Sequence, residues 1–266
     1  MTIDKKYLKQ VKFIGHIVNS KDNEIFKNAM TMLINSFKNP KNVYNTIFSS
    51  DSLITWGKNL SFLRDEDFLR SYNTVINYSD MVNEKQKGLI WRSYIFDYFA
   101  NNCVNIEGDF LELGVYKGDS AHLLCDRIGF NKFGKNYYLY DLFVWKDGDD
   151  HISLTDLSDE KIYDFVVSRF SKFDFVKIIR GKVPDSLEGT LPEKVAFAHI
   201  DMNNADAEAA AFEAIYPRLS VGGAIIFDDY GWWQLSDQKI AIDKKMKAFG
   251  QRILELPTGQ GLLLKY

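Results

Sequence analysis

The spacing of apolar residues changes near residue 105, and this change divides the chain into two parts. In the first part, apolar side chains recur at intervals of three and four over 23–34 and again over 83–99, which predicts two amphipathic helices. The segment between them, 41–82, is rich in aromatic residues and has no regular period. We therefore predict a helical N-terminal extension over 1–82, which either forms a lid or pocket wall or only covers the core.

From residue 108 onward, short apolar runs alternate with stretches of helical period. The runs that predict strands are 109–114, 137–141, 175–181, 195–201 and 224–229. Two further runs flank a Pro-Thr-Gly-Gln-Gly segment near the C-terminus and predict a hairpin. Alternation of strands and helices is typical of an α/β fold. We predict a Rossmann-like, mostly parallel sheet of seven strands over 83–266, with a C-terminal antiparallel hairpin.

The first predicted strand leads into a turn that contains Gly114 and Gly118, and a helical stretch follows over 121–128. A strand, a glycine turn and a helix N-terminus form the usual opening of a nucleotide site. The middle glycine of the dinucleotide fingerprint is missing, and Glu112 would disfavour a pyrophosphate. A ligand with an ammonium group, such as S-adenosylmethionine (SAM), fits this turn better. The alternative is an ordinary strand-to-helix turn.

Acidic residues stand at the ends of four predicted strands: Glu112, Asp141, Asp201 and the pair Asp228-Asp229. Ligands in open α/β sheets bind beyond the carboxyl ends of the strands. An acid after the second strand is placed to accept hydrogen bonds from a ribose diol, so we assign this role to Asp141. The alternative for Asp141 is a turn residue.

Asp201, Asp228 and Asp229 follow two strands that we expect to be neighbours. Three converging carboxylates repel one another unless a cation lies between them. Oxygen ligands favour Mg²⁺, with Mn²⁺ or Ca²⁺ as alternatives. His199 precedes Asp201 by two residues and lies on the same strand face, either as a ligand or base or as a core histidine.

The composition excludes several classes of protein. With 266 residues, 46% hydrophobic and 26% charged, the chain is of globular type, and a net charge of −3 gives no attraction to nucleic acid or to an anionic membrane. An apolar run of 18 residues and a signal-peptide core are both missing, which predicts a cytoplasmic protein. Cys103 and Cys125 stand in apolar surroundings, as buried thiols do.

Four stretches resemble the macrocin O-methyltransferase (TylF/MycF-type) family, namely 108–120, 199–201, 216–223 and 228–231. The resemblance covers about 85–266 and implies a class I, SAM-dependent and metal-dependent sugar O-methyltransferase. By position, the methionine part of SAM would be lined by Glu112, Gly114, Tyr116, Gly118 and Ser120, its ribose held by Asp141, its adenine bordered by Arg180, Gly181 and Lys182, and Mg²⁺ bound by Asp201, Asp228 and Asp229. Family members usually carry an acid where this chain has Asn203.

The resulting hypothesis is methyl transfer from SAM to a sugar hydroxyl, with Mg²⁺ assistance. Asp201 would accept the proton, with His199 and Tyr230 as further candidates. We expect the acceptor to be a nucleotide-activated sugar for surface polysaccharide, or the sugar of a glycosylated natural product. Similar enzymes form homo-oligomers, so we expect one here.

Three other functions remain open at the level of sequence. A catechol-type O-methyltransferase would use the same carboxylates on an aromatic diol. A nicotinamide-dependent oxidoreductase is disfavoured by the missing glycine. A SAM-binding protein without catalysis would follow if Asn203 reflects lost chemistry.

Overall fold

The structure is a computed structural model that describes residues 47–50, 53–56, 58–76, 89–144 and 161–266. The chain divides along its sequence into two compact units, with Ser61 the last residue of the first and Phe62 the first residue of the second. The helix predicted over 23–34 lies outside the described residues. In the first unit, strands β1 (Ile47–Ser50) and β2 (Leu53–Trp56) pair antiparallel. The N-terminal extension therefore contains a hairpin that the sequence analysis missed. Branched and aromatic residues in both segments explain it, since these favour strands.

The second unit contains the predicted seven-stranded sheet. Its strands lie in the order β5-β4-β3-β6-β7-β9-β8, and the first five are mutually parallel while β9 runs antiparallel to both β7 and β8. This confirms the predicted parallel sheet with its C-terminal hairpin. The strand bounds are Asp109–Leu113 (β3), Tyr137–Asp141 (β4), Val176–Arg180 (β5), Val195–Ile200 (β6), Leu219–Phe227 (β7), Leu254–Glu255 (β8) and Gly261–Leu264 (β9).

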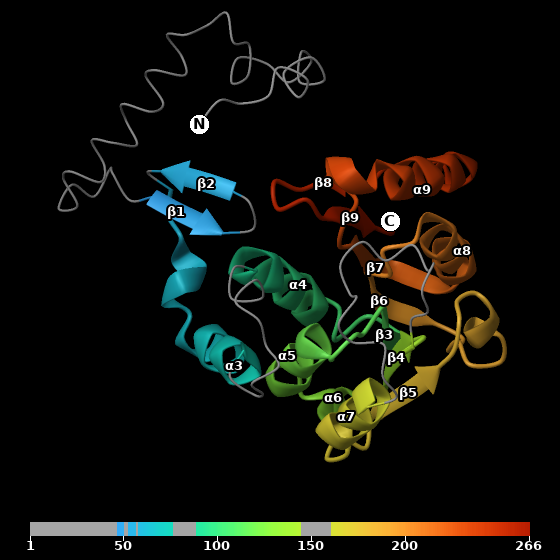
Figure 1. Ribbon diagram of the computed structural model, residues 1–266, viewed down its shortest axis with the longest axis horizontal. Coiled ribbons are helices and arrows are strands. Elements are labelled where there is room, and N and C mark those ends of the chain that lie inside the picture. Colours follow the sequence, from blue (N-terminus) through green and yellow to red (C-terminus); the bar gives the residue numbers. More distant parts are fainter. Residues whose placement is uncertain (1–46, 51–52, 57, 77–88, 145–160) are drawn as a thin grey trace, which may run out of the picture. The chain divides into compact units, whose positions relative to one another are not determined.

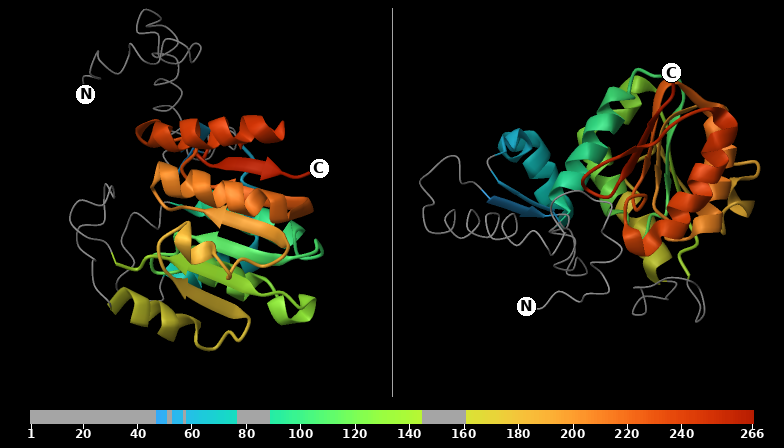
Figure 2. Two further views of the ribbon diagram at one scale, coloured as in Figure 1. Left: turned by 90° about the vertical axis from the view of Figure 1, so that its right-hand side faces the viewer. Right: turned by 90° about the horizontal axis from the view of Figure 1, so that it is seen from above.

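Helices cover both faces of this sheet, as Figure 1 and the right-hand view of Figure 2 show. Helices α4 and α5 lie on one face, and α8 and α9 lie on the other. Helix α7 packs on α5, and α6 is a single turn. The bounds are Glu66–Ile76 (α3), Ile90–Asn102 (α4), Asp119–Arg127 (α5), Phe130–Phe133 (α6), Lys161–Phe170 (α7), Ala205–Ile215 (α8) and Ser236–Phe249 (α9).

Helix α3 falls within the segment that we predicted to be irregular. It begins after Asp65, whose carboxylate accepts a hydrogen bond from the Phe68 N–H at 2.8 Å and so caps the helix. Phe68, Tyr72 and Val75 recur at helical spacing and are buried. The helix packs against α5 and α4, so it is part of the sheet unit. The aromatic residues that seemed irregular are its buried face.

Strand β7 begins earlier than predicted. The apolar run predicts a strand over 224–229, but β7 already pairs with β6 at Leu219. The register then shifts, and Gly222 adopts φ +85°, a backbone conformation that favours glycine. Residues 220–223 thus form a bulge within the strand.

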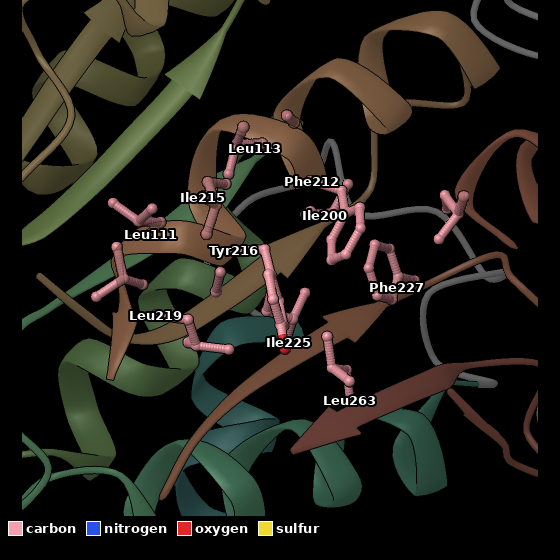
Figure 3. Packing of buried hydrophobic residues seen from close by; sticks show 14 of the residues in the cluster. Leu111, Leu113, Ile200, Phe212, Ile215, Tyr216, Leu219, Ile225, Phe227 and Leu263 are labelled. Atoms are coloured by element: carbon pink, nitrogen blue, oxygen red, sulfur yellow. The ribbon is translucent and has the colours of Figure 1, made fainter. Parts of the chain in front are cut away.

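Alternating side chains assign the two faces of the sheet. Leu111, Leu113, Ile200 and Phe227 belong to the buried cluster that α8 covers, where Figure 3 shows them around Phe212. Residues one position away point to the opposite face, toward α4 and α5. That face carries aromatic packing first, and then two polar side chains toward the carboxyl ends of its strands: Phe110, Phe197, Glu112 and His199.

Two further expectations concern the chain as a whole. Cys103 and Cys125 are free, buried thiols, as predicted. Among the helices that the structure describes, none is long and apolar enough to span a bilayer.

Candidate active site

The predicted glycine turn joins β3 to α5. Gly114 and Gly118 have φ values of +89° and +78°, and Tyr116 between them has φ +50°. A Cβ on Gly114 would lie 1.7 Å from the carbonyl oxygen of Asp201, so the ends of β3 and β6 touch at this point. A Cβ on Gly118 would lie 2.5 Å from the Phe170 ring. Both positions therefore require glycine for conformation and for space.

The carboxylate of Asp141, at the end of β4, holds this turn in place. Its Oδ2 accepts hydrogen bonds of 2.7 Å from the N–H groups of Val115 and Tyr116, and its Oδ1 accepts one from Phe143. The residue is 8% exposed. The alternative role as a turn residue is therefore realised, whereas the role in binding ribose stays a prediction.

Glu112 is fully buried beneath the turn and has partners within the chain. Its Oε1 accepts a hydrogen bond of 2.5 Å from Ser120 at the start of α5, and its Oε2 accepts one from the Tyr137 hydroxyl. The Nδ1 atom of His199 lies 3.9 Å from Oε1. Glu112 and Ser120 are thus adjacent, as the resemblance implies, and the carboxylate also links three elements of the core.

Arg169 of α7 supports the turn from the side, a residue that the sequence analysis missed. Its guanidinium donates hydrogen bonds to the Lys117 carbonyl at 2.7 Å and to Asp119 at 2.6 Å, and its Nη2 lies 3.3 Å from Nδ1 of His122. Burial, and then the charge of Arg169, lower the pKa of His122 to about 4. His122 is therefore neutral at pH 7, and its Nδ1 can accept from Arg169.

The predicted acids converge at the ends of β6 and β7. Backbone hydrogen bonds from Asp201 to Leu113 and from Asp228 to Ile200 hold the three strand ends together. Potential ligand atoms of His199, Asp201 and Asp228 all lie within 4.8 Å of one another. Asp229, the third predicted ligand, stands outside this set, whereas His199 is within it. Carboxylate oxygens suit Mg²⁺ or Mn²⁺, so the two aspartates fit the predicted metal, whereas an imidazole nitrogen favours a transition metal.

Two residues that the sequence analysis missed bind Asp228. Arg92 of α4 donates a hydrogen bond to Oδ2 and lies 3.8 Å from Oδ1 of Asp229. Gln260, just before β9, donates to Oδ1 of Asp228 at 3.0 Å. The sequence carries a signal for Arg92, since position 92 shares a helix face with the apolar positions 89 and 96.

The charges within this group determine its protonation. Burial would raise the pKa of Asp228, but Arg92 and His199 hold it below its usual range. Burial, followed by the charges of Asp228 and Asp229, raises the pKa of Asp201 well above its usual range. Burial would lower the pKa of His199, yet Asp228 and Glu112 raise it to about 10. In this arrangement Asp201 holds its proton to a higher pH than an exposed aspartate does.

One cavity of about 170 Å³ connects the turn with the carboxylates. Its walls come from the glycine turn and α5, from the ends of β6 and β7, and from α3 and α4. Of the sequence-predicted site residues, those that line it are Gly114, Tyr116, Ser120, His199, Asp201 and Asp228. Glu112, Gly118 and Asp141 lie behind this wall, where they support the turn.

The remaining predicted residues lie elsewhere in the sheet unit. At the end of β5, the Arg180 guanidinium lies 5.1 Å from the Tyr163 ring, Gly181 donates its N–H to the Asp141 carbonyl, and Lys182 follows. The Tyr230 hydroxyl donates to Asp243 of α9 at 2.6 Å. Tyr230 is turned toward α9, so we do not include it among the residues that act on the substrate.

The raised pKa of Glu208 on α8 should make the free energy of unfolding fall as the pH rises. It is 2% exposed and accepts a hydrogen bond from the Met202 N–H, while burial raises its pKa to about 8 from 4.5. Between pH 4.5 and 8 the unfolded chain loses this proton and the folded chain keeps it, so the unfolded chain is increasingly favoured. We expect Glu208→Gln to remove this loss, which amounts to about 1.4 kcal/mol for each pKa unit.

Urea unfolding at pH 5 and pH 8 measures this effect. The wild type should lose more of its free energy of unfolding between the two pH values than Glu208→Gln loses. Glu213→Gln, an exposed glutamate of the same helix paired with Lys245, is the matched control and should behave like the wild type. Equal losses in the wild type and Glu208→Gln would contradict the prediction.

Comparison with known proteins agrees with this fold. Residues 111–230 match the family model of a methyltransferase domain. The O-methyltransferase NovP aligns with a TM-score of 0.57 at 18% identity, over 66% of this chain and 80% of NovP. The calicheamicin methyltransferase CalS11 aligns with a TM-score of 0.53 at 16% identity, over 78% of this chain and 94% of CalS11. At these identities the likeness shows a shared fold.

A further structure of CalS11, described as a TDP-rhamnose 3′-O-methyltransferase, aligns with a TM-score of 0.50 at 16% identity, over 78% of this chain and 96% of that protein. No curated protein sequence matches the chain. The matched segment contains most of β3, the glycine turn, Asp141 and the ends of β6 and β7. These parts contribute to the site described above, whereas Arg92 and Gln260 lie outside the matched segment. Residues 111–230 therefore match a methyltransferase domain, and the sheet unit has the fold of the O-methyltransferases NovP and CalS11.

Proposed function

We propose that the chain transfers the methyl group of SAM to a hydroxyl of a small molecule, with a sugar or nucleotide-activated sugar as the favoured acceptor. The observation that carries this proposal is the shared cavity, which has the glycine turn on one wall and the carboxylates on another. The turn is the proposed donor site, because Gly114, Tyr116 and Ser120 line this cavity at the N-terminus of α5. TDP-rhamnose as the acceptor of CalS11 supports the choice of sugar.

Bound SAM would supply a methyl group already activated on its sulfonium. The protein must then position the acceptor oxygen in line with the methyl carbon and remove the hydroxyl proton. As the new O–C bond forms and the S–C bond breaks, the electron pair of the S–C bond stays on sulfur and the hydroxyl proton passes to a base. Gly114, Tyr116 and Ser120 line the donor side, and His199, Asp201 and Asp228 line the acceptor side.

Asp201 is the favoured base in its ionised form, which burial and the neighbouring carboxylates disfavour. A divalent cation held by Asp201, Asp228 and Asp229 would lower both the pKa of Asp201 and that of a nearby hydroxyl. Asp228 is already anionic, because Arg92 and His199 stabilise its carboxylate. His199 would act as a base only if its raised pKa fell, which makes it the second candidate.

Calorimetric titration with S-adenosylhomocysteine (SAH), with and without Mg²⁺, tests the proposal first. We expect micromolar binding, about −8 kcal/mol. Ser120→Phe, which places a ring in the cavity, should weaken binding at least about 10-fold, or about 1.4 kcal/mol. Ser171→Phe at an exposed position after α7 is the matched control and should bind as the wild type does. Failure of the wild type to bind SAH would overturn the proposal.

The acceptor class is then tested by SAH release with a panel of nucleotide sugars, glycosylated natural products and catechols. Turnover with the sugars supports the proposal. Turnover with catechols alone would assign the catechol-type activity instead, and SAH binding without turnover on any acceptor would favour a non-catalytic protein. Light scattering of the same sample tests the expected homo-oligomer.

A further inference from the structure

The candidate metal site already has a cation of its own. Arg92 has a side chain that is 13% exposed, and its guanidinium pairs with Asp228 and approaches Asp229. The Trp232 ring lies 5.5 Å from the centre of this guanidinium. Arg92 therefore lies on two of the three carboxylates that would hold a divalent cation.

His199 provides an independent sign that the group takes a ligand. Its side chain is 5% exposed, it lines the cavity, and neither ring nitrogen makes a hydrogen bond among the described residues. Its Nε2 lies 3.4 Å from Oδ1 of Asp228. A buried imidazole beside two carboxylates, with ligand atoms within 4.8 Å, has the composition of a metal site.

Asp228 is the residue at which the two cations compete. Its Oδ2 binds Arg92, and its Oδ1 accepts from Gln260. A divalent ion on Oδ2 would stand at the position of the guanidinium, and the two positive charges would repel strongly in a buried site. Both cannot bind Asp228 in this way together.

We propose that Arg92 and a divalent cation are mutually exclusive partners of Asp228, so that Arg92 sets the metal affinity of the site. The metal itself rests on the proposed function. Binding a metal here requires breaking the contact between Arg92 and Asp228, and this requirement weakens the measured affinity. Removing the guanidinium removes the requirement and strengthens metal binding, the opposite of what loss of a supporting residue would do.

Titration of the full-length protein with Mn²⁺, with free Mn²⁺ followed by electron paramagnetic resonance, tests this. Arg92→Met should bind Mn²⁺ at least about 10-fold more tightly than the wild type, about 1.4 kcal/mol. Arg70→Met is the matched control, because it removes the same charge from an exposed pair with Asp67 and should bind as the wild type does. Adding Asp228→Asn to Arg92→Met should abolish the gain.

A folded Arg92→Met protein that binds Mn²⁺ no more tightly than the wild type would overturn the proposal, as would a gain that survives Asp228→Asn. If Arg92→Met does not fold, Arg92→Gln is measured in the same way and should bind at least about threefold more tightly. SAH titration of the wild type distinguishes failure of this proposal from failure of the methyltransferase proposal. Absence of SAH binding together with stronger Mn²⁺ binding by Arg92→Met would refute the methyltransferase proposal and retain the competition.

Discussion

Replacing Gly114 by alanine should leave little folded protein. The new Cβ would lie 1.7 Å from the Asp201 carbonyl oxygen and 2.5 Å from its carbonyl carbon, and both are backbone atoms that cannot move without separating β3 from β6. A φ of +89° adds about 1–3 kcal/mol of strain. With the steric overlap, we expect a loss of at least about 4 kcal/mol, against a total stability of about 5–15 kcal/mol.

Soluble yield and urea unfolding measure this loss, and Gly134→Ala is the matched control. Gly134 also has a positive φ, +63°, but nothing lies within 4 Å of the position that its Cβ would take. This variant should lose only the backbone preference, about 1–2 kcal/mol. Similar stabilities for the two variants would show that the contact between Gly114 and Asp201 is looser than described.

Replacing Asp228 by asparagine should reduce turnover about 10³-fold while SAH affinity stays within about threefold. The substitution keeps the shape of the side chain and removes the anion to which Arg92 and His199 are matched. It also leaves Arg92 less fully paired in a buried position, which costs about 3 kcal/mol of stability. The donor side is spared, because Gly114, Tyr116 and Ser120 lie on another wall of the cavity.

The measurement is the kcat of SAH release by the Asp228→Asn variant, at saturating SAM and with the first acceptor found. The Asp97→Asn variant, measured in the same way, is the control. Asp97 is 3% exposed and pairs with Arg127, so this control removes a buried anion from a buried pair away from the cavity. It should lose similar stability and keep its turnover. Turnover of Asp228→Asn within about 10-fold of the wild type would exclude Asp228 from the chemistry.

The sheet could be predicted because its strands carry strong local patterns. Runs such as 195–198 are apolar throughout, as buried parallel strands must be, and four of the predicted strands carry an acid at or near the carboxyl end. Helix α3 and the hairpin at 47–56 could not be predicted in this way. Their aromatic residues suit either element, and contacts with α4 and α5 select the helix for α3.

The sequence predicts that the acidic residues of the candidate site lie close together, but it does not predict which residues bind them. Strand order brings Asp201 beside Asp228, and this follows from the topology alone. Arg92 and Gln260 come from segments more than 30 residues away in the sequence, so local spacing does not indicate which acid each one binds. Local spacing also does not indicate that the Tyr230 hydroxyl binds Asp243 on α9 rather than facing the cavity.

The close approach of Gly114 to the Asp201 carbonyl restricts which residues of the cavity wall can change. Residues at the strand ends must keep this contact, whereas residues on the helical wall can be replaced more freely. Because the glycine turn and the end of β6 at Asp201 share this backbone contact, a shift in one moves the other. The opposite wall, formed by Tyr72, Val75, Leu89 and Ser93 on or beside α3 and α4, belongs to helices and not to these strand ends. A protein engineer who seeks a new acceptor should therefore vary these four positions and leave the strand ends alone.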